Sequence, residues 1–220
     1  MEILQGVIHY FNQGGLVMYF LLLASIGAGA VIIDRWRYYR RRRAPLKAHW
    51  QKVKEMSAGK KPAEVAAYFA QRHTALDKMT AAGFRAQAGG RNVSLALEAS
   101  AQLEAAKLKK GLPVLAMLVT LSPILGLMGT VIGMIQSFSV FNLQSGSPMA
   151  ITGGVGEALI ATVTGLMVAT LALLGHSYFG LQLDSMVTDM EQLGSLLEDM
   201  FFTTKGQMVT ERGKKQHEAA

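Results

Sequence analysis

The sequence predicts an all-α membrane protein with three transmembrane helices and long cytoplasmic helical extensions. Three observations lead to this class. Residues 111–183 contain no Lys or Arg, and their only acidic or basic side chains are Glu157 and His176. This stretch holds two long apolar runs, and each can cross a bilayer core of about 30 Å as a helix of roughly 20 residues. A third apolar run near the N-terminus ends in a cluster of arginines.

The first apolar run, residues 14–33, is expected to be a transmembrane helix, with residues 1–13 outside the cytoplasm. A secretory signal peptide would carry a basic leader and a small-residue cleavage site, whereas here the positive charge follows the run. Basic residues and aromatic belts mark the cytoplasmic ends of membrane helices. The cytoplasmic end is therefore predicted at these residues: Trp36, Tyr38, Tyr39, Arg40, Arg41, Arg42 and Arg43.

Residues 34–110 are expected to form a basic cytoplasmic loop that is mostly helical. They hold 18 of the 22 Lys and Arg residues of a chain with a net charge of +7. A basic chain can bind nucleic acid, but this charge flanks apolar spans, so no nucleic acid is expected as a partner. Residues 92–110 favour a helix by composition and are expected to continue into the second span as one helix of about 48 residues.

The second span, residues 111–140, and the third, residues 157–180, are expected to pair as a hairpin through an outer loop, 141–156. Three spans with the N-terminus outside place residues 181–220, an amphipathic helix and tail, in the cytoplasm. The acidic side chains of that helix either attract the basic loop or form a solvated face. Thr152 is a candidate N-cap of the third span.

Small residues and prolines in the hairpin predict close helix packing and bends. Glycines at helical spacing allow helix backbones to approach closely in lipid, and prolines inside helices cause bends. Packing alone can explain each glycine. The residues expected to pack or bend the hairpin are Pro113, Pro123, Gly126, Gly129, Gly133 and Gly165.

Polar groups in the hairpin are the candidate functional residues. Thr130 and Thr162 are each expected roughly 15 Å from the outer end, at matched depth, where they could form a polar ring in an oligomer. A lone membrane threonine, however, usually bonds its own backbone. Glu157 is a functional candidate because an acid within a membrane helix is costly. The alternative is that the outer helix terminus stabilises its carboxylate, and about 140° separates it from Thr162 around an ideal helix.

Other kinds of chemistry find no support in the sequence. Cysteine is absent, and the histidines are scattered without ligand spacing, so no metal site is expected. His176 is interpreted as an interfacial residue rather than a proton relay. No sequence motif of an enzyme or of a cofactor site is present. We therefore expect neither an enzyme nor a cofactor.

Two sequence blocks carry a family resemblance. LSPILGLMGTVIGMI (residues 121–135), followed by GVGEALIATVTGL (154–166), resembles the MotA/TolQ/ExbB proton-channel family, and GGLVMYFLLL (14–23) is similar to its ExbB/TolQ-like members. The resemblance implies a pentamer in the bacterial inner membrane, with the second and third spans around a central pore. It also implies a single-span partner of the ExbD/TolR type that brings an ion-carrying Asp. Thr130 and Thr162 match the pore threonines, and Glu157 matches the acid of the third-span motif.

The resemblance implies a subunit of an energy-transducing motor that couples the proton-motive force to an envelope process such as TonB-dependent import. A TonB-like protein and membrane lipids are then further partners. Two alternatives stay open: a passive membrane scaffold whose glycines only pack helices, and a flagellar or gliding-type stator subunit that uses sodium.

Overall fold

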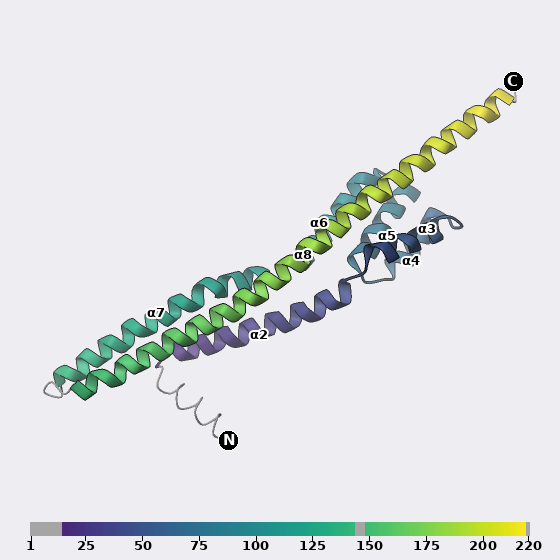
Figure 1. Ribbon diagram of the computed structural model, residues 1–220. Coiled ribbons are helices and arrows are strands. Elements are labelled where there is room, and N and C mark those ends of the chain that lie inside the picture. Colours follow the sequence, from purple (N-terminus) through teal and green to yellow (C-terminus); the bar gives the residue numbers. More distant parts are fainter. Residues whose placement is uncertain (1–14, 144–147, 219–220) are drawn as a thin grey trace, which may run out of the picture. The chain divides into compact units, whose positions relative to one another are not determined.

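The structure is a computed structural model that describes residues 15–143 and 148–218, and every regular element in these ranges is an α-helix. The predicted all-α class is confirmed. Helices α2, α7 and α8 each contain a segment long and apolar enough to cross a membrane (Figure 1). In chain order the helices are α2 (Val17–Arg42), α3 (Leu46–Ser57), α4 (Pro62–Ala70), α5 (Ala75–Ala88), α6 (Val93–Lys109), α7 (Leu112–Leu143) and α8 (Pro148–Glu218).

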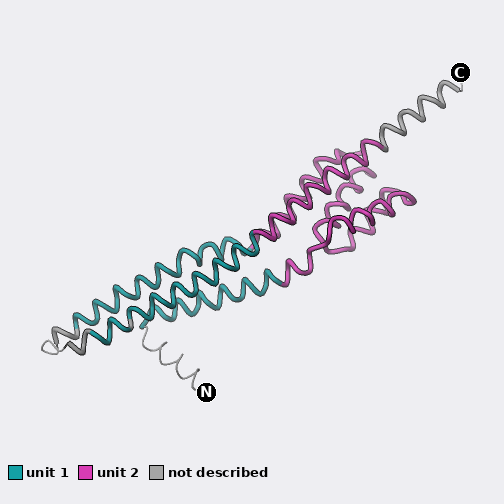
Figure 2. Tube along the Cα trace, viewed as in Figure 1, with its two compact units in different colours: residues 1–36, 111–180 teal, residues 37–110, 181–220 magenta. Residues whose placement is uncertain are grey.

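The chain divides into two compact units (Figure 2). Unit 1 comprises residues 1–36 and 111–180, and unit 2 comprises residues 37–110 and 181–220. Helices α2 and α8 contribute residues to both units. Unit 1 therefore holds the apolar parts of α2, α7 and α8, whereas unit 2 holds the basic helices and the last part of α8.

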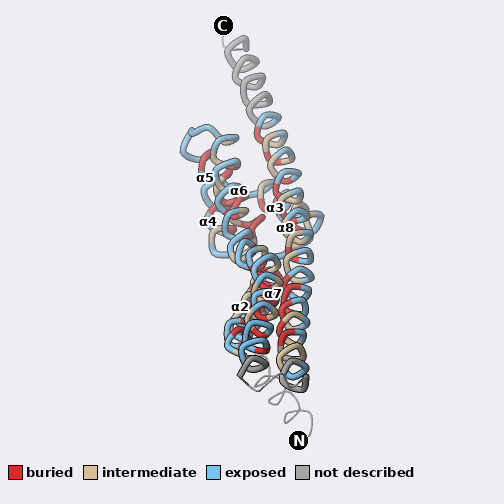
Figure 3. Tube along the Cα trace, turned by 90° about the vertical axis from the view of Figure 1, so that its left-hand side faces the viewer, coloured by how far each residue is buried: buried red, intermediate tan, exposed pale blue. Residues whose placement is uncertain are grey.

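Unit 1 packs through a narrow apolar interior and leaves much apolar surface exposed. Val17, Met18 and Leu21 of α2 are buried against Leu125, Ile132 and Ile160. Exposed positions recur along all three helices (Figure 3), and they include Leu23, Ile124 and Leu174, each at least 60% exposed. Aliphatic side chains on the outside of a helix bundle are expected where lipid or another subunit is the neighbour.

Unit 2 is built around side chains that recur at helical spacing on α8. Met186, Met190, Leu193, Leu197 and Phe201 are buried, so the amphipathic stripe predicted for this segment is present. The ring of Phe201 packs edge-on against Phe84 of α5, with centroids 5.0 Å apart. The described contact between α8 and the basic helices is therefore apolar at this point.

Local signals explain where the helices of unit 2 begin. Thr74 and Asp77 form a reciprocal capping box at the start of α5, and this arrangement satisfies two backbone N–H groups that the helix itself leaves unpaired. The Asn92 side chain accepts a hydrogen bond from the backbone N–H of Leu95 at the start of α6. Pro62 opens α4, where its missing N–H and fixed φ suit a first helical turn.

Two expectations about helix limits are wrong. Helix α6 ends at Lys109 and α7 begins at Leu112, with Gly111 at φ +90° between them, so residues 92–140 are not one helix. Glycine adopts this left-handed conformation without the penalty that other residues pay. Pro113 then lies in the first turn of α7 and does not bend its interior. Helix α8 begins at Pro148, so Thr152 lies within the helix and is not its N-cap.

Candidate functional site

The candidate site is the seam where α7 and α8 pack closely in antiparallel directions. A Cβ atom on Gly126 would lie 3.1 Å from both the carbonyl oxygen of Ala161 and the Cα of Thr162. A Cβ on Gly129 would lie 2.5 Å from the Cβ of Ala161. The contact at Gly129 is closer than real Cβ atoms come, and the contact at Gly126 would require the facing backbone to shift by a few tenths of an ångström.

The same close approach continues in both directions along the seam. A Cβ on Gly165 would lie 2.6 Å from the carbonyl oxygen of Ser122 and 3.0 Å from the Cα of Gly126. Toward the other end, a Cβ on Gly133 would meet the backbone oxygen of Gly154 at 3.1 Å. All four glycines named from the sequence therefore lie where α7 and α8 touch.

Thr162 joins the two helices through a hydrogen bond. Its hydroxyl donates to the carbonyl oxygen of Gly126 at 3.2 Å, across the seam, and the side chain is half-buried. Most membrane threonines donate to their own helix one turn back, so this bond is a specific feature of the hairpin. Glycine at position 126 favours this approach, because a Cβ there would lie 3.1 Å from the Cα of Thr162 and press the two helices apart.

Thr130 has a different environment. Its hydroxyl donates to the carbonyl oxygen of Leu127 on its own helix at 2.6 Å, and the side chain is half-buried. Thr130 follows Gly129, which packs on Ala161, whereas Thr162 packs on Gly126. The two threonines therefore lie about one turn apart along the seam, roughly 5 Å at 1.5 Å per residue, and not at matched depth as the sequence suggested.

Glu157 lies in α8 directly before Ala158, whose Cβ would be 3.2 Å from a Cβ on Gly133. The Glu157 side chain is outside the residues whose side chains the structure describes. Because α8 begins at Pro148, Glu157 falls in the third turn of the helix. The field of a helix terminus fades within the first turn, so it does not account for a carboxylate at this position.

Two neighbouring residues of α7 each leave a hydrogen bond unmade inside a continuous helix. Pro123 lies inside α7, and its ring nitrogen cannot donate to the carbonyl of Val119 one turn back. Ser122 is fully buried, and its hydroxyl has no hydrogen-bond partner among the described residues. Sequence reasoning did not single out Ser122, although a serine directly before an intrahelical proline was visible.

The arginines predicted as orientation anchors divide into two kinds. Arg42 forms an ion pair with Glu104 at 3.0 Å and lies over the ring of Tyr38 at 5.0 Å. Arg43 donates to the side-chain oxygen of Gln182 at 3.0 Å. Arg40 and Arg41 are exposed. Arg42 thus joins α2 to a buried carboxylate of α6, whereas the contact of Arg43 with Gln182 is an exposed hydrogen bond.

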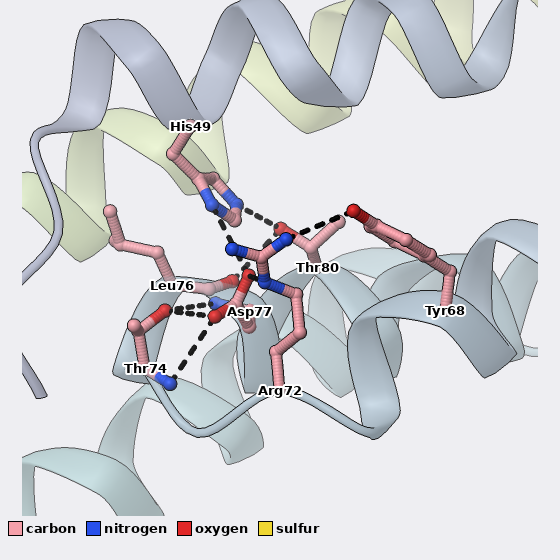
Figure 4. A network of polar contacts seen from close by, with 7 residues as sticks. All are labelled: His49, Tyr68, Arg72, Thr74, Leu76, Asp77 and Thr80. Carbon is pink, nitrogen blue, oxygen red and sulfur yellow. Dashed lines mark hydrogen bonds and ion pairs between the residues drawn. The ribbon is translucent and has the colours of Figure 1, made fainter.

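Sequence reasoning also missed a buried polar cluster in unit 2 (Figure 4). His49 of α3 points toward Asp77 and Thr80 of α5. The Thr80 hydroxyl lies 2.9 Å from the carbonyl oxygen of Leu76, to which it donates, and 2.9 Å from the His49 Nε2 atom, where the tautomer of His49 sets which group donates. The His49 Nδ1 atom then faces an Asp77 oxygen at 3.5 Å.

The surroundings of His49 favour its neutral form. Burial of the imidazole lowers the pKa of His49 below its ordinary value of 6.5, the Asp77 carboxylate opposes this shift, and the Arg72 guanidinium acts with burial. Arg72 lies 3.5 Å from Asp77 and donates to the Tyr68 hydroxyl at 2.9 Å. No spacing rule predicts this cluster, because His49 and Asp77 lie on different helices far apart in sequence.

The fold and the seam define an all-α protein with several membrane-spanning helices and a separate helical unit. The sequence profile of the MotA/TolQ/ExbB proton channel family matches residues 71–192, more than half of the chain. The chain belongs to this family.

Curated relatives carry names from two branches of that family. The chain is 34% identical to the putative biopolymer transport protein ExbB-like 1 of Synechocystis over 174 residues, which are 74% of this chain and 66% of that protein. It is 34% identical to the biopolymer transport protein ExbB of Xanthomonas campestris over 50% of this chain and 44% of that protein. It is 33% identical to the Tol-Pal system protein TolQ of Pseudomonas aeruginosa over 43% of this chain and 42% of that protein. The match thus spans between about two fifths and two thirds of these relatives.

Proposed function

We propose that the chain is the ion-conducting subunit of an energy-transducing motor of the ExbB/TolQ type in a bacterial inner membrane. The motor would couple the proton-motive force to an envelope process such as TonB-dependent import. The observation that carries the proposal is the hydroxyl-bearing seam in an otherwise apolar hairpin, where Thr162 bonds Gly126 across the helices. Family membership and the names of the relatives support it.

The working assembly is a homopentamer whose α7 and α8 segments surround a pore. A single-span partner of the ExbD/TolR type supplies an ion-carrying Asp, and a TonB-like protein receives the resulting movement. The N-terminus lies outside and the C-terminus in the cytoplasm, because all basic side chains then fall on the inner side. The exposed aliphatic surface of unit 1 supports contact with further helices or lipid.

The two threonines suit the proton-carrying form of a partner's acid. Both hydroxyl protons are donated to backbone carbonyls, those of Leu127 and Gly126. The oxygens of Thr130 and Thr162 therefore present lone pairs, which accept hydrogen bonds. A protonated carboxyl group can donate to such an oxygen, whereas a carboxylate only accepts. The pore threonines would thus stabilise the partner's Asp while it carries the proton.

A passive scaffold is the second candidate, and one observation favours it. The Thr130 hydroxyl and the Thr162 hydroxyl both already have backbone acceptors, and the glycines of the seam are explained by packing. A scaffold needs nothing more. A sodium-driven stator subunit remains a variant of the motor proposal, because threonine oxygens can also contact a metal cation.

The experiment is an ion-flux assay on the full chain, purified with its co-expressed single-span partner and reconstituted into proteoliposomes with a trapped pH dye. Thr130→Val and Thr162→Val should assemble but conduct protons at least tenfold more slowly. Thr130→Ser and Thr162→Ser keep the hydroxyl and should retain most of the flux. Thr170→Val is the matched control, because Thr170 is an exposed α8 threonine that donates to its own helix at Leu166.

Unchanged flux in both valine variants would favour the scaffold and contradict the motor. Equal loss in Thr170→Val would show that any membrane hydroxyl matters, and the site assignment would then be wrong. A sodium gradient replacing the proton gradient tests the stator variant with the same vesicles: flux that follows sodium alone would assign the ion.

A further inference from the structure

Unit 2 contains a groove that the proposed ion pathway does not use. The groove has a volume of about 540 Å³ and lies between α6 and residues 187–198 of α8, with Met79 of α5 contributing to its wall. Leu97 and Met190 also line it and are almost completely buried. The inner wall of the groove is therefore apolar.

Small residues on both facing helices create the groove. Ala101 and Ala105 line it from α6, and Gly194 and Ser195 line it from α8. A Cβ on Gly194 would lie 3.0 Å from the Cε atom of Met79, so even alanine would press on this wall. Larger residues at Ala101, Ala105 or Gly194 would fill the space between the helices, whereas Ser195 is exposed at the rim. The small side chains on these turns of α6 and α8 thus leave the groove open.

The rim of the groove carries negative charge. Glu98 lines it from α6, and Glu191 and Glu198 line it from α8. Glu191 and Glu198 are two turns apart on one helix face, or about 10 Å along α8. None of the ion pairs among the described residues involves any of these three glutamates; Glu98 accepts a hydrogen bond from Gln102 at 3.2 Å.

We propose that this groove binds a basic amphipathic segment of the single-span partner, on the cytoplasmic side. The proposal rests on the proposed function, which supplies both the partner and the cytoplasmic placement of unit 2. A single membrane span carries Lys and Arg on whichever flank faces the cytoplasm. Such a segment would place apolar side chains against Met79, Leu97 and Met190 and its basic side chains against the three glutamates. Binding here would give the partner a second attachment besides the pore.

The basic end of the same chain does not suit the groove. The last basic residues, from Lys205 onward, belong to α8, which continues as one helix to Glu218. A segment that continues the helix lining the groove cannot turn back into it. A second copy of the chain could still cover the groove in an oligomer, and the experiment separates that occupant from the partner.

The test uses site-specific photo-crosslinking in the full chain, expressed with a tag in its own host. Benzoylphenylalanine replaces Ser195, an exposed residue on the rim of the groove. Benzoylphenylalanine at Ser185, an exposed serine of α8 that does not line the groove, is the matched control. Mass spectrometry identifies the protein and the peptide joined at each position.

The expected result is a crosslink from position 195, and not from 185, to a Lys/Arg-rich peptide next to the single span of the partner. Glu198→Lys should weaken that crosslink at least about fivefold, because a rim charge is reversed. Asp199→Lys adds the same charge on an exposed, non-lining position of the same turn and should leave the crosslink unchanged.

A crosslink to a second copy of this chain would overturn the proposal, and so would failure to crosslink a single-span protein that co-purifies. Either result leaves the proposed function standing if proton flux depends on Thr130 and Thr162. If no single-span protein co-purifies and no flux is found, the proposed function fails and the groove proposal fails with it. Equal weakening by Glu198→Lys and Asp199→Lys would show a general charge effect and contradict a specific groove.

Discussion

Gly165→Ala tests whether the close approach of α7 and α8 holds the candidate site together. The new Cβ would lie 2.6 Å from the carbonyl oxygen of Ser122 and 3.0 Å from the Cα of Gly126. Both neighbours are backbone atoms, which cannot rotate away as a side chain can. The helices must therefore separate by about half an ångström or more, because real Cβ atoms essentially never come closer than 3.0 Å to a heavy atom.

The magnitude follows from two opposing terms. Overpacking of this kind costs about 1–3 kcal/mol, whereas alanine gains about 0.5–1 kcal/mol over glycine inside a helix. We expect a net loss of about 1–2 kcal/mol in the free energy of unfolding. Thr162 lies within one turn of Gly165, so separation of the helices should also lengthen its 3.2 Å bond to Gly126.

The assay is unfolding of the full chain by SDS titration in mixed micelles, followed by circular dichroism. Gly180→Ala is the matched control, because a Cβ on Gly180 of the same helix meets nothing within 4 Å. That variant should be neutral or slightly stabilised. If Gly165→Ala is as stable as Gly180→Ala, α7 and α8 do not pack at the observed distance, and the reasoning from the seam is refuted.

Three further predictions concern groups away from the glycine contacts. Burial lowers the pKa of His49 in the folded chain. As the pH falls below about 6.5, the unfolded chain therefore binds a proton at His49 before the folded chain does, which lowers the stability of the fold. Hydrogen-exchange protection of α3 and α5 should decrease from pH 7.5 to 5.5; His49→Gln should remove this dependence, and the exposed His73→Gln should not. Arg42→Ala should destabilise the full chain by about 1–3 kcal/mol, because it leaves the buried Glu104 with Lys107 as its remaining ion-pair partner. Equal melting temperatures of Arg42→Ala and the exposed Arg41→Ala would contradict this. Ser122→Ala removes a buried hydroxyl without a described partner, so its thermal stability in detergent should be unchanged or higher, and a clear loss would show that the hydroxyl has a partner.

The features set by the bilayer could be predicted from the sequence. A helix that crosses a membrane needs a long apolar run, and three such runs gave α2, α7 and α8 without any tertiary information. The glycines of the seam were also visible, because helical spacing alone places Gly126, Gly129 and Gly133 on one face. These predictions rest on the local pattern of apolar and small residues along the chain, which the bilayer constrains strongly.

The break between α6 and α7 was missed because the composition on both sides favours a helix. The local signal was present: Gly111 adopts φ +90°, and Pro113 follows in the first turn of α7. A glycine just after one helix and a proline at the start of the next are known boundary residues.

The buried cluster around His49 could not be predicted, because it depends on tertiary packing. His49, Arg72 and Asp77 come from α3, the connection before α5, and α5 itself. Their meeting depends on how short helices fold back on one another, and no period in the sequence encodes that. Asp77 could be assigned locally as part of a capping box, but its contact with His49 could not.

The different bonds of Thr130 and Thr162 show why depth alone was a poor guide to their roles. Counting residues from the hairpin turn treats the two positions as equivalent, yet the register of α7 against α8 places them about one turn apart. Thr162→Val removes a bond between helices, so it should lower both stability and proton flux. Thr130→Val removes a bond within one helix, so it should lower flux with little change in unfolding. If the protein is a scaffold, Thr162→Val should lower stability, and Thr130→Val should change neither stability nor flux. Measuring both properties on both variants therefore separates a pore residue from a packing residue more sharply than flux alone.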